Sequence, residues 1–208
     1  MAYSLRLIED RLAAGASPPA PRRGVPRVLF VRSGTLRDGD ATAPVPAVGP
    51  NHAAVRAGTD GAHLYRVELV RQPPPLAGGR VLLEHPLDLA GGAAWLMRCD
   101  RVDFEPGGVA PRHRHRGGGI RCLLRGRLEV TVADGAPRVI RPGECWFESG
   151  REPVLAIAAR DDETSFIRFS VLPAEIRGQS SIRYVDPADA GRGKPRRYTV
   201  LVDEPIAL

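Results

Sequence analysis

Two histidines separated by one residue are the side chains of this sequence best suited to chemistry. His113 and His115 flank Arg114, and three glycines follow at residues 117–119. Residues i and i+2 of a β-strand project to the same face, so the two imidazoles can converge on one metal ion or one bound anion. We therefore expect the functional site to lie in or near residues 113–126.

The elements that would position this pair are predicted to be short β-strands. Apolar runs are separated by clusters of Gly, Pro and Asp, and Asp134-Gly135 has the composition of a hairpin turn. This pattern is typical of a sandwich or barrel, and only the first dozen residues and residues 187–191 are expected to be helical. Strands are predicted at residues 94–104, 120–124, 128–133, 138–140, 145–147, 154–159, 165–172 and 198–202.

Composition supports a folded protein with reduced cysteines. The chain has 208 residues, of which 43% are hydrophobic, enough for one large all-β domain or two small halves. Its three cysteines, Cys99, Cys122 and Cys145, lack CxxC spacing, which indicates neither a disulfide framework nor a zinc knuckle. Acidic residues near the N-terminus and the absence of a long apolar run predict a cytoplasmic protein with no membrane partner.

The net charge of +6 raises the question of nucleic-acid binding. Lys194 is the only lysine, and the arginines are spread through every segment instead of gathering on one helix or arm. Aromatic residues, on which bases could stack, are scarce. The distribution therefore disfavours nucleic-acid binding, which would predict strongly salt-dependent retention on DNA.

The two halves of the chain share a weak internal similarity. At an offset of 92 residues, two glycines, one proline, one arginine and one leucine recur, and residues 64–70 match 166–172 after a small gap. We predict that the first half is a degenerate copy of the second half. Only the second half carries the histidine pair. The predicted organisation is a degenerate half at residues 1–79, a barrel at 80–172 and an extension at 173–208 that packs on the barrels or on a dimer partner, with a linker at 72–79.

The second half resembles the cupin superfamily, the RmlC-like jelly rolls. Gly107, His113, His115 and Gly126 match the first cupin motif, and residues 141–150 match the family's PGD stretch and the strand after it. The resemblance covers about residues 95–172. It implies an all-β fold, a double-stranded β-helix or jelly-roll barrel, and the internal similarity extends this to a bicupin of two related halves.

Two of the four metal ligands usual in the family are missing. The family's glutamate position falls on Gly119, and its third histidine falls on Val154. A divalent metal held by two imidazoles alone would bind weakly, because metal sites normally use three or more protein ligands.

Glu148 is the leading candidate to complete the ligand set, since a carboxylate on an apolar strand is costly to bury unless paired or bound to metal. With His113 and His115 it would form a facial triad that leaves positions open for substrate and oxygen, and it would be the catalytic residue. Alternatively, Glu148 lies in solvent at the strand end or pairs with an arginine.

Arg121 and Trp146 are the candidate substrate-binding residues. If the cupin positions face inward, alternation turns Arg121 inward too, where its guanidinium would bind a carboxylate next to the histidines. The alternatives are that Arg121 only neutralises Glu148 and that Trp146 is a core residue.

These observations predict binding of a small acidic molecule in the C-terminal barrel, with a divalent metal, either Fe, Mn, Ni or Zn, held by His113, His115 and Glu148. Oxygenase- or isomerase-like chemistry would follow, without an organic cofactor. The alternative is a non-catalytic binding or regulatory cupin that has lost its metal. Because cupins often dimerise through exchanged strands, we also predict a homodimer.

Overall fold

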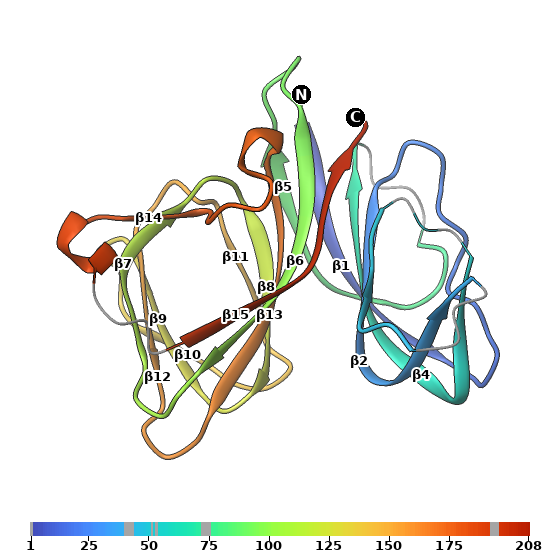
Figure 1. Cartoon of the computed structure of the whole chain (residues 1–208), viewed down its shortest axis with the longest axis horizontal. Helices are drawn as coiled ribbons and strands as arrows, with labels where there is room; N and C mark the ends of the chain where they lie inside the picture. Colours follow the sequence, from blue (N-terminus) through green and yellow to red (C-terminus); the bar gives the residue numbers. More distant parts are fainter. Residues whose placement is uncertain (1, 40–43, 51, 53, 72–75, 192–195) are drawn as a thin grey trace. The chain divides into compact units, whose positions relative to one another are not determined.

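A computed structural model describes residues 2–39, 44–50, 52, 54–71, 76–191 and 196–208. These residues form an all-β protein, which confirms the predicted fold class (Figure 1). The chain divides into two compact units, one of Met1–Cys99 with Leu201–Leu208 and the other of Asp100–Val200. No helix within the described ranges is both long and apolar enough to cross a membrane.

The first unit is built on one antiparallel sheet of strand order β3-β2-β4-β1-β5. Leu29, Leu36 and Leu64 are buried in its core together with smaller apolar side chains of β3 and β4. Its strands are β1 (Ala2–Leu12), β2 (Arg27–Asp38), β3 (Ala47–Val48), β4 (Val55–Val70) and β5 (Arg80–Asp88).

The first dozen residues form strand β1, so the prediction of a helix there is wrong. Leu5 and Leu7 are fully buried on one face of the strand. Arg6 and Asp10 are buried on the other face, where they pair with Glu84 and Arg66. Because both faces of the strand are buried and one of them contains charged residues, the alternation of apolar and polar residues that marks a strand is lost.

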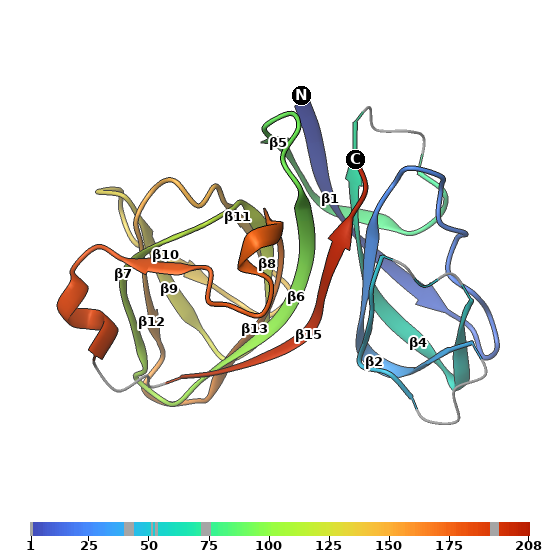
Figure 2. The ribbon, with the colours of Figure 1, turned by 45° about the horizontal axis from the view of Figure 1, so that its top comes forward.

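The second unit contains two antiparallel sheets, of order β10-β9-β12-β7-β14 and β11-β8-β13-β6-β15. Figures 1 and 2 show these two sheets facing each other, as in a jelly roll. Leu123, Leu128, Trp146 and Phe166 contribute to the apolar core of this unit. The strands are β6 (Trp95–Phe104), β7 (Val109–His115), β8 (Gly119–Arg125), β9 (Leu128–Val132), β10 (Arg138–Ile140), β11 (Cys145–Glu148), β12 (Val154–Ala158), β13 (Thr164–Pro173), β14 (Ile182–Tyr184) and β15 (Arg196–Ile206).

The unit boundary differs from the predicted one because of strand pairing. β5, predicted to begin the barrel, pairs with β1 and so belongs to the first unit. Most of the predicted extension, including β14 and the start of β15, belongs to the second unit, where β14 pairs with β7. Residues 187–191 form the expected helical turn, a 3-10 helix, while part of the predicted linker, residues 72–75, lies outside the described residues.

Candidate functional site

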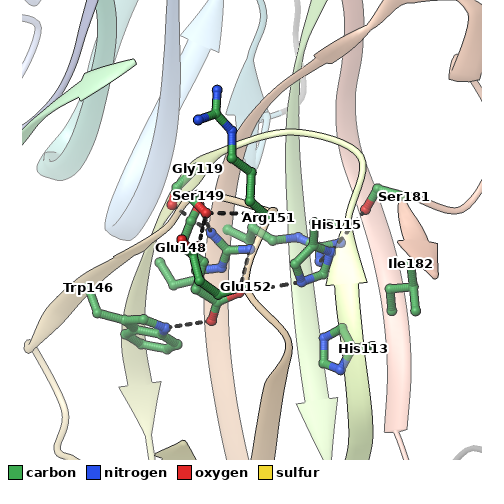
Figure 3. A network of polar contacts seen from close by, with 12 residues as sticks. His113, His115, Gly119, Trp146, Glu148, Ser149, Arg151, Glu152, Ser181 and Ile182 are labelled. Atoms are coloured by element: carbon green, nitrogen blue, oxygen red, sulfur yellow. Dashed lines mark hydrogen bonds and ion pairs between the residues drawn. The ribbon is translucent and has the colours of Figure 1, made fainter. Parts of the chain in front are cut away.

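Strand β7 places the histidine pair inside the second unit. His113 and His115 are 5% and 9% exposed, and their ring centroids lie 4.8 Å apart with the rings nearly perpendicular. Figure 3 shows the two rings next to each other, with Glu148 and Trp146 on the far side of His115. Alternation along β7 accounts for this, since the intervening Arg114 is exposed and donates to the Arg151 carbonyl oxygen.

Glu148, at the end of β11, has three partners from the predicted site. Its Oε2 lies 2.8 Å from Nη2 of Arg121 and 3.4 Å from Nε2 of His115, and its Oε1 accepts a 2.8 Å hydrogen bond from Trp146 Nε1. Burial raises the pKa of Glu148, but the Arg121 charge and the contacts with His115 and Trp146 outweigh it and hold that pKa well below its usual range. Glu148 is therefore an ionised carboxylate paired with an arginine.

Both histidines are neutral, and their partners fix which nitrogen carries the proton. Nδ1 of His113 lies 2.7 Å from the Pro111 carbonyl oxygen, to which it must donate, so Nε2 keeps a lone pair. Nδ1 of His115 lies 3.4 Å from Nη1 of Arg168, which can only donate, so the proton of His115 is on Nε2 and faces Glu148. Burial lowers the pKa of His113, and it lowers that of His115 to about 3 although Glu148 opposes the shift.

A second buried ion pair, which the sequence reasoning missed, lies beside the first. Arg168 on β13 donates from Nε and Nη2 to both carboxylate oxygens of Asp100 on β6, at 2.9 and 2.7 Å. Arg168 is the register partner of Arg121. Its inward direction could have been read from Phe166, a core residue two positions earlier on the same strand.

The polar segment after β13 also contributes to the site, although it was predicted to be an extension. Tyr184 on β14 is the register partner of His113, and their ring centroids are 6.4 Å apart. Arg196, only 8% exposed, donates to the hydroxyls of Tyr184 and Tyr198 at 2.7 and 2.6 Å and to the Val109 carbonyl oxygen at 3.3 Å. Within the described ranges Arg196 has no carboxylate partner.

Arg196 also borders a hollow of about 390 Å³ in the second unit. The ends of β6, β8, β13 and β15 line it, with Phe104, Thr164 and Ser165 among the wall residues. Much of the remaining wall is charged, and there arginines pair with acids, as Arg125 does with Glu163. Arg196 therefore lies at the edge of this hollow.

The residues of the predicted metal site do not fit a divalent cation in this arrangement. Among the described residues, no group of three or more His, Cys, Asp and Glu side chains is placed to hold a metal ion. A cation at His115 would have to displace Arg121 from Glu148 and lie near the charge of Arg168. The missing glutamate has no room either, because a Cβ on Gly119 would lie 2.3 Å from the Phe169 carbonyl oxygen.

The jelly-roll sheets and the inward histidine pair define a cupin barrel, and the comparisons agree. The family model described as a cupin domain matches residues 100–167. The match covers most of the second unit, so this unit is similar to a cupin domain. Among curated proteins, none matches the sequence.

Solved structures with this fold share little sequence with the chain. A conserved protein of unknown function from Pseudomonas aeruginosa PAO1 is 14% identical, with a TM-score of 0.55 over 81% of this chain and 82% of that one. A putative glyoxylate-induced protein from Pseudomonas aeruginosa is 15% identical, with a TM-score of 0.54 over 82% and 75%. A variant of the salicylate 1,2-dioxygenase from Pseudoaminobacter salicylatoxidans, in complex with gentisate, is 12% identical, with a TM-score of 0.54 over 95% and 73%. At these identities the likeness shows the fold alone.

Proposed function

We propose that the second unit binds a small carboxylic acid without a metal, as a binding or regulatory module. The observation that carries this proposal is the charge of Arg196. Among the described residues of the unit, the buried charged side chains are three arginines and two acids, and the two acids pair with Arg121 and Arg168. Within the same residues Arg196 contacts only neutral oxygens.

A buried charge without a counter-charge is costly, so an anion beside Arg196 would be stabilised. The neighbouring groups suit a carboxylate. Because Tyr184 and Tyr198 accept hydrogen bonds from Arg196, each hydroxyl still has its own proton to donate. The site thus offers one guanidinium charge and two phenol donors.

His113 adds an acceptor to this set. Its Nε2 lone pair, left by the bond between Nδ1 and Pro111, can accept a hydrogen bond from a hydroxyl group of the ligand. Since Tyr184 packs against His113, the donors and the acceptor lie on neighbouring residues. A carboxylate that carries a hydroxyl group nearby is therefore the ligand chemistry that fits best.

A thermal-shift screen tests this function, since a ligand that binds only the folded state raises the melting temperature. Small hydroxy acids should stabilise the wild-type protein, whereas their amides should not. Arg196→Gln should lose at least ten-fold in affinity. Arg183→Gln removes the same charge from an exposed position of β14 and is the matched control. Equal stabilisation by acids and amides, or equal loss in both variants, contradicts the proposal.

A metal-dependent enzyme is the second candidate, favoured by the adjacent imidazoles and by Glu148 lying 3.4 Å from His115. It requires Arg121 to leave Glu148 before Fe, Mn, Ni or Zn could bind. Elemental analysis of the purified protein and of the His113→Ala/His115→Ala double variant separates the two candidates. Equal metal content in both proteins removes the metal-dependent one. The cytoplasmic location stays a prediction from the sequence.

We also propose that the two units are copies of one ancestral half, as in a bicupin. The first unit has its own bidentate pair, Arg66 with Asp10, at 2.7 and 3.1 Å. Arg66 aligns with Arg168 in the sequence match of residues 64–70 with 166–172, and both pairs join corresponding strands. Leu29, the register partner of Arg66, stands where the second unit has Arg121. In a crystal structure, superposition of the units that fails to align Asp10 with Asp100 would contradict a duplication.

A further inference from the structure

Two of the three cysteines face each other across the strands that carry the ion pair. Cys122 on β8 and Cys145 on β11 are register partners, so their side chains project from the same face of the sheet. We propose that they form a reversible cross-strand disulfide, which makes this strand pair a modification site for hydroperoxides. The proposal is independent of the ligand.

The hydrogen-bond pattern of β8 suits such a bridge. Leu123 donates its N–H to the Glu144 carbonyl oxygen and accepts from the N–H of Gly143, so Leu123 directs both backbone groups towards β11. In an antiparallel pair such positions alternate with positions that lack these bonds, which makes Cys122 and Cys145 a non-hydrogen-bonded pair. The Cα atoms of such a pair lie about 4.5 Å apart. A disulfide needs a Cα separation of roughly 4.4–6.8 Å.

The two thiols differ in access, which gives the reaction an order. Cys122 is fully buried, whereas Cys145 is partly exposed at the start of β11. The Cys145 thiolate attacks hydrogen peroxide, the O–O bond breaks, and sulfenic acid and hydroxide form. The Cys122 sulfur then attacks the sulfenic sulfur, the S–S bond forms, and the oxygen leaves as water. Two thiols are oxidised and one peroxide is reduced to two waters.

The bridge would lie beside the candidate site. The register pair next to it is Arg121 with Trp146, and the end of the same pairing is Gly119 with Glu148. A covalent link between β8 and β11 would therefore hold together the strands that carry both partners of the Arg121–Glu148 ion pair. We expect the oxidised protein to melt at a higher temperature than the reduced one.

Limited oxidation followed by mass spectrometry tests the proposal on the wild-type chain. After treatment with hydrogen peroxide, the intact mass should fall by two hydrogen atoms, and dithiothreitol should restore it. Non-reducing tryptic digestion should give peptide 122–125 linked to peptide 139–151. Sulfinic acid at Cys145 or a link between two chains, without this crosslink, would overturn the proposal.

Single substitutions give the matched controls. Cys99→Ser changes the third cysteine, which lies on β6, and should leave the crosslink unchanged. Cys122→Ala should leave Cys145 as a sulfenic acid that dimedone traps, because the second sulfur is absent. Cys145→Ser should show no loss of hydrogen at the same peroxide dose. Loss of the mass change in Cys99→Ser would place the bridge elsewhere and contradict the assignment.

Discussion

At the scale of single residues, the interpretation of this site depends on the contacts of Glu148. The sequence alone allows Glu148 to be a metal ligand, the partner of an arginine or a solvent-exposed residue at the strand end. The choice depends on which inward residues lie opposite it, and that is set by the pairing of β11 with β8. In the structure, the carboxylate of Glu148 contacts Arg121, Trp146 and His115. Arg168, Asp100 and Arg196 were missed since each stands singly in a strand or a polar segment.

The first prediction concerns the Arg121–Glu148 pair. Glu148→Gln should lower the free energy of unfolding by about 3–5 kcal/mol, because it leaves the Arg121 charge buried without its partner. Arg121→Met should lower the free energy of unfolding similarly, because it leaves the Glu148 charge buried without its partner. Urea denaturation of both single variants and the double variant measures the coupling. The double variant should be more stable than the sum of the single losses implies, and strict additivity would refute the buried pair.

The second prediction concerns pH. The folded-state pKa of His115 is about 3 against an ordinary 6.5, so below pH 6.5 the unfolded chain takes up a proton that folded His115 does not. Stability therefore falls as pH decreases from 6.5 towards 3, by about 3 kcal/mol between pH 7 and pH 4 from this residue. The lowered pKa values of His113 and Glu148 act in the same direction. Urea denaturation of His115→Gln should show a shallower pH dependence, and curves parallel to the wild type would contradict the shift.

At the scale of elements, the strands of the second unit were largely predictable because turn residues bound them. The residues of β6 and of β8–β13 were each anticipated to within a residue or two. β1 was not, since its inward charges pair with β4 and β5, which are distant in sequence. The close approach of β8 to β13 also could not be predicted from the sequence. This close approach explains why residue 119 is a glycine, since a side chain there would meet the backbone of β13.

The third prediction tests that approach. Gly119→Ala should lower the free energy of unfolding by about 1–3 kcal/mol, because the new Cβ meets the Phe169 carbonyl oxygen and backbone of β13. Gly191→Ala, where a Cβ meets nothing within 4 Å, is the control and should be nearly neutral. Thermal denaturation of the two variants compares them directly. Equal melting temperatures of the two variants would contradict a close approach of β8 to β13 at residue 119.

At the scale of the whole molecule, the fourth prediction is the homodimer. Strand exchange was expected to involve residues 198–202, but these lie in β15, which neighbours β6 in the chain's own sheet. A dimer would therefore form through another surface or require β15 to exchange. Sedimentation at micromolar concentration measures the state, and a monomer would refute the prediction. The proposed duplication was indicated in the sequence only by a few shared residues and by the match of residues 64–70 with 166–172, because the buried Arg–Asp pairs were not recognised as partners.

The hydrogen bond between Trp146 and Glu148 has a practical consequence. The chain has two tryptophans, Trp95 and Trp146. In Trp95→Phe all indole fluorescence would come from Trp146, whose Nε1 donates to the carboxylate at the centre of the site. Emission wavelength and intensity would then report events at Glu148, such as its protonation or the departure of Arg121. The protein carries its own optical probe of the site.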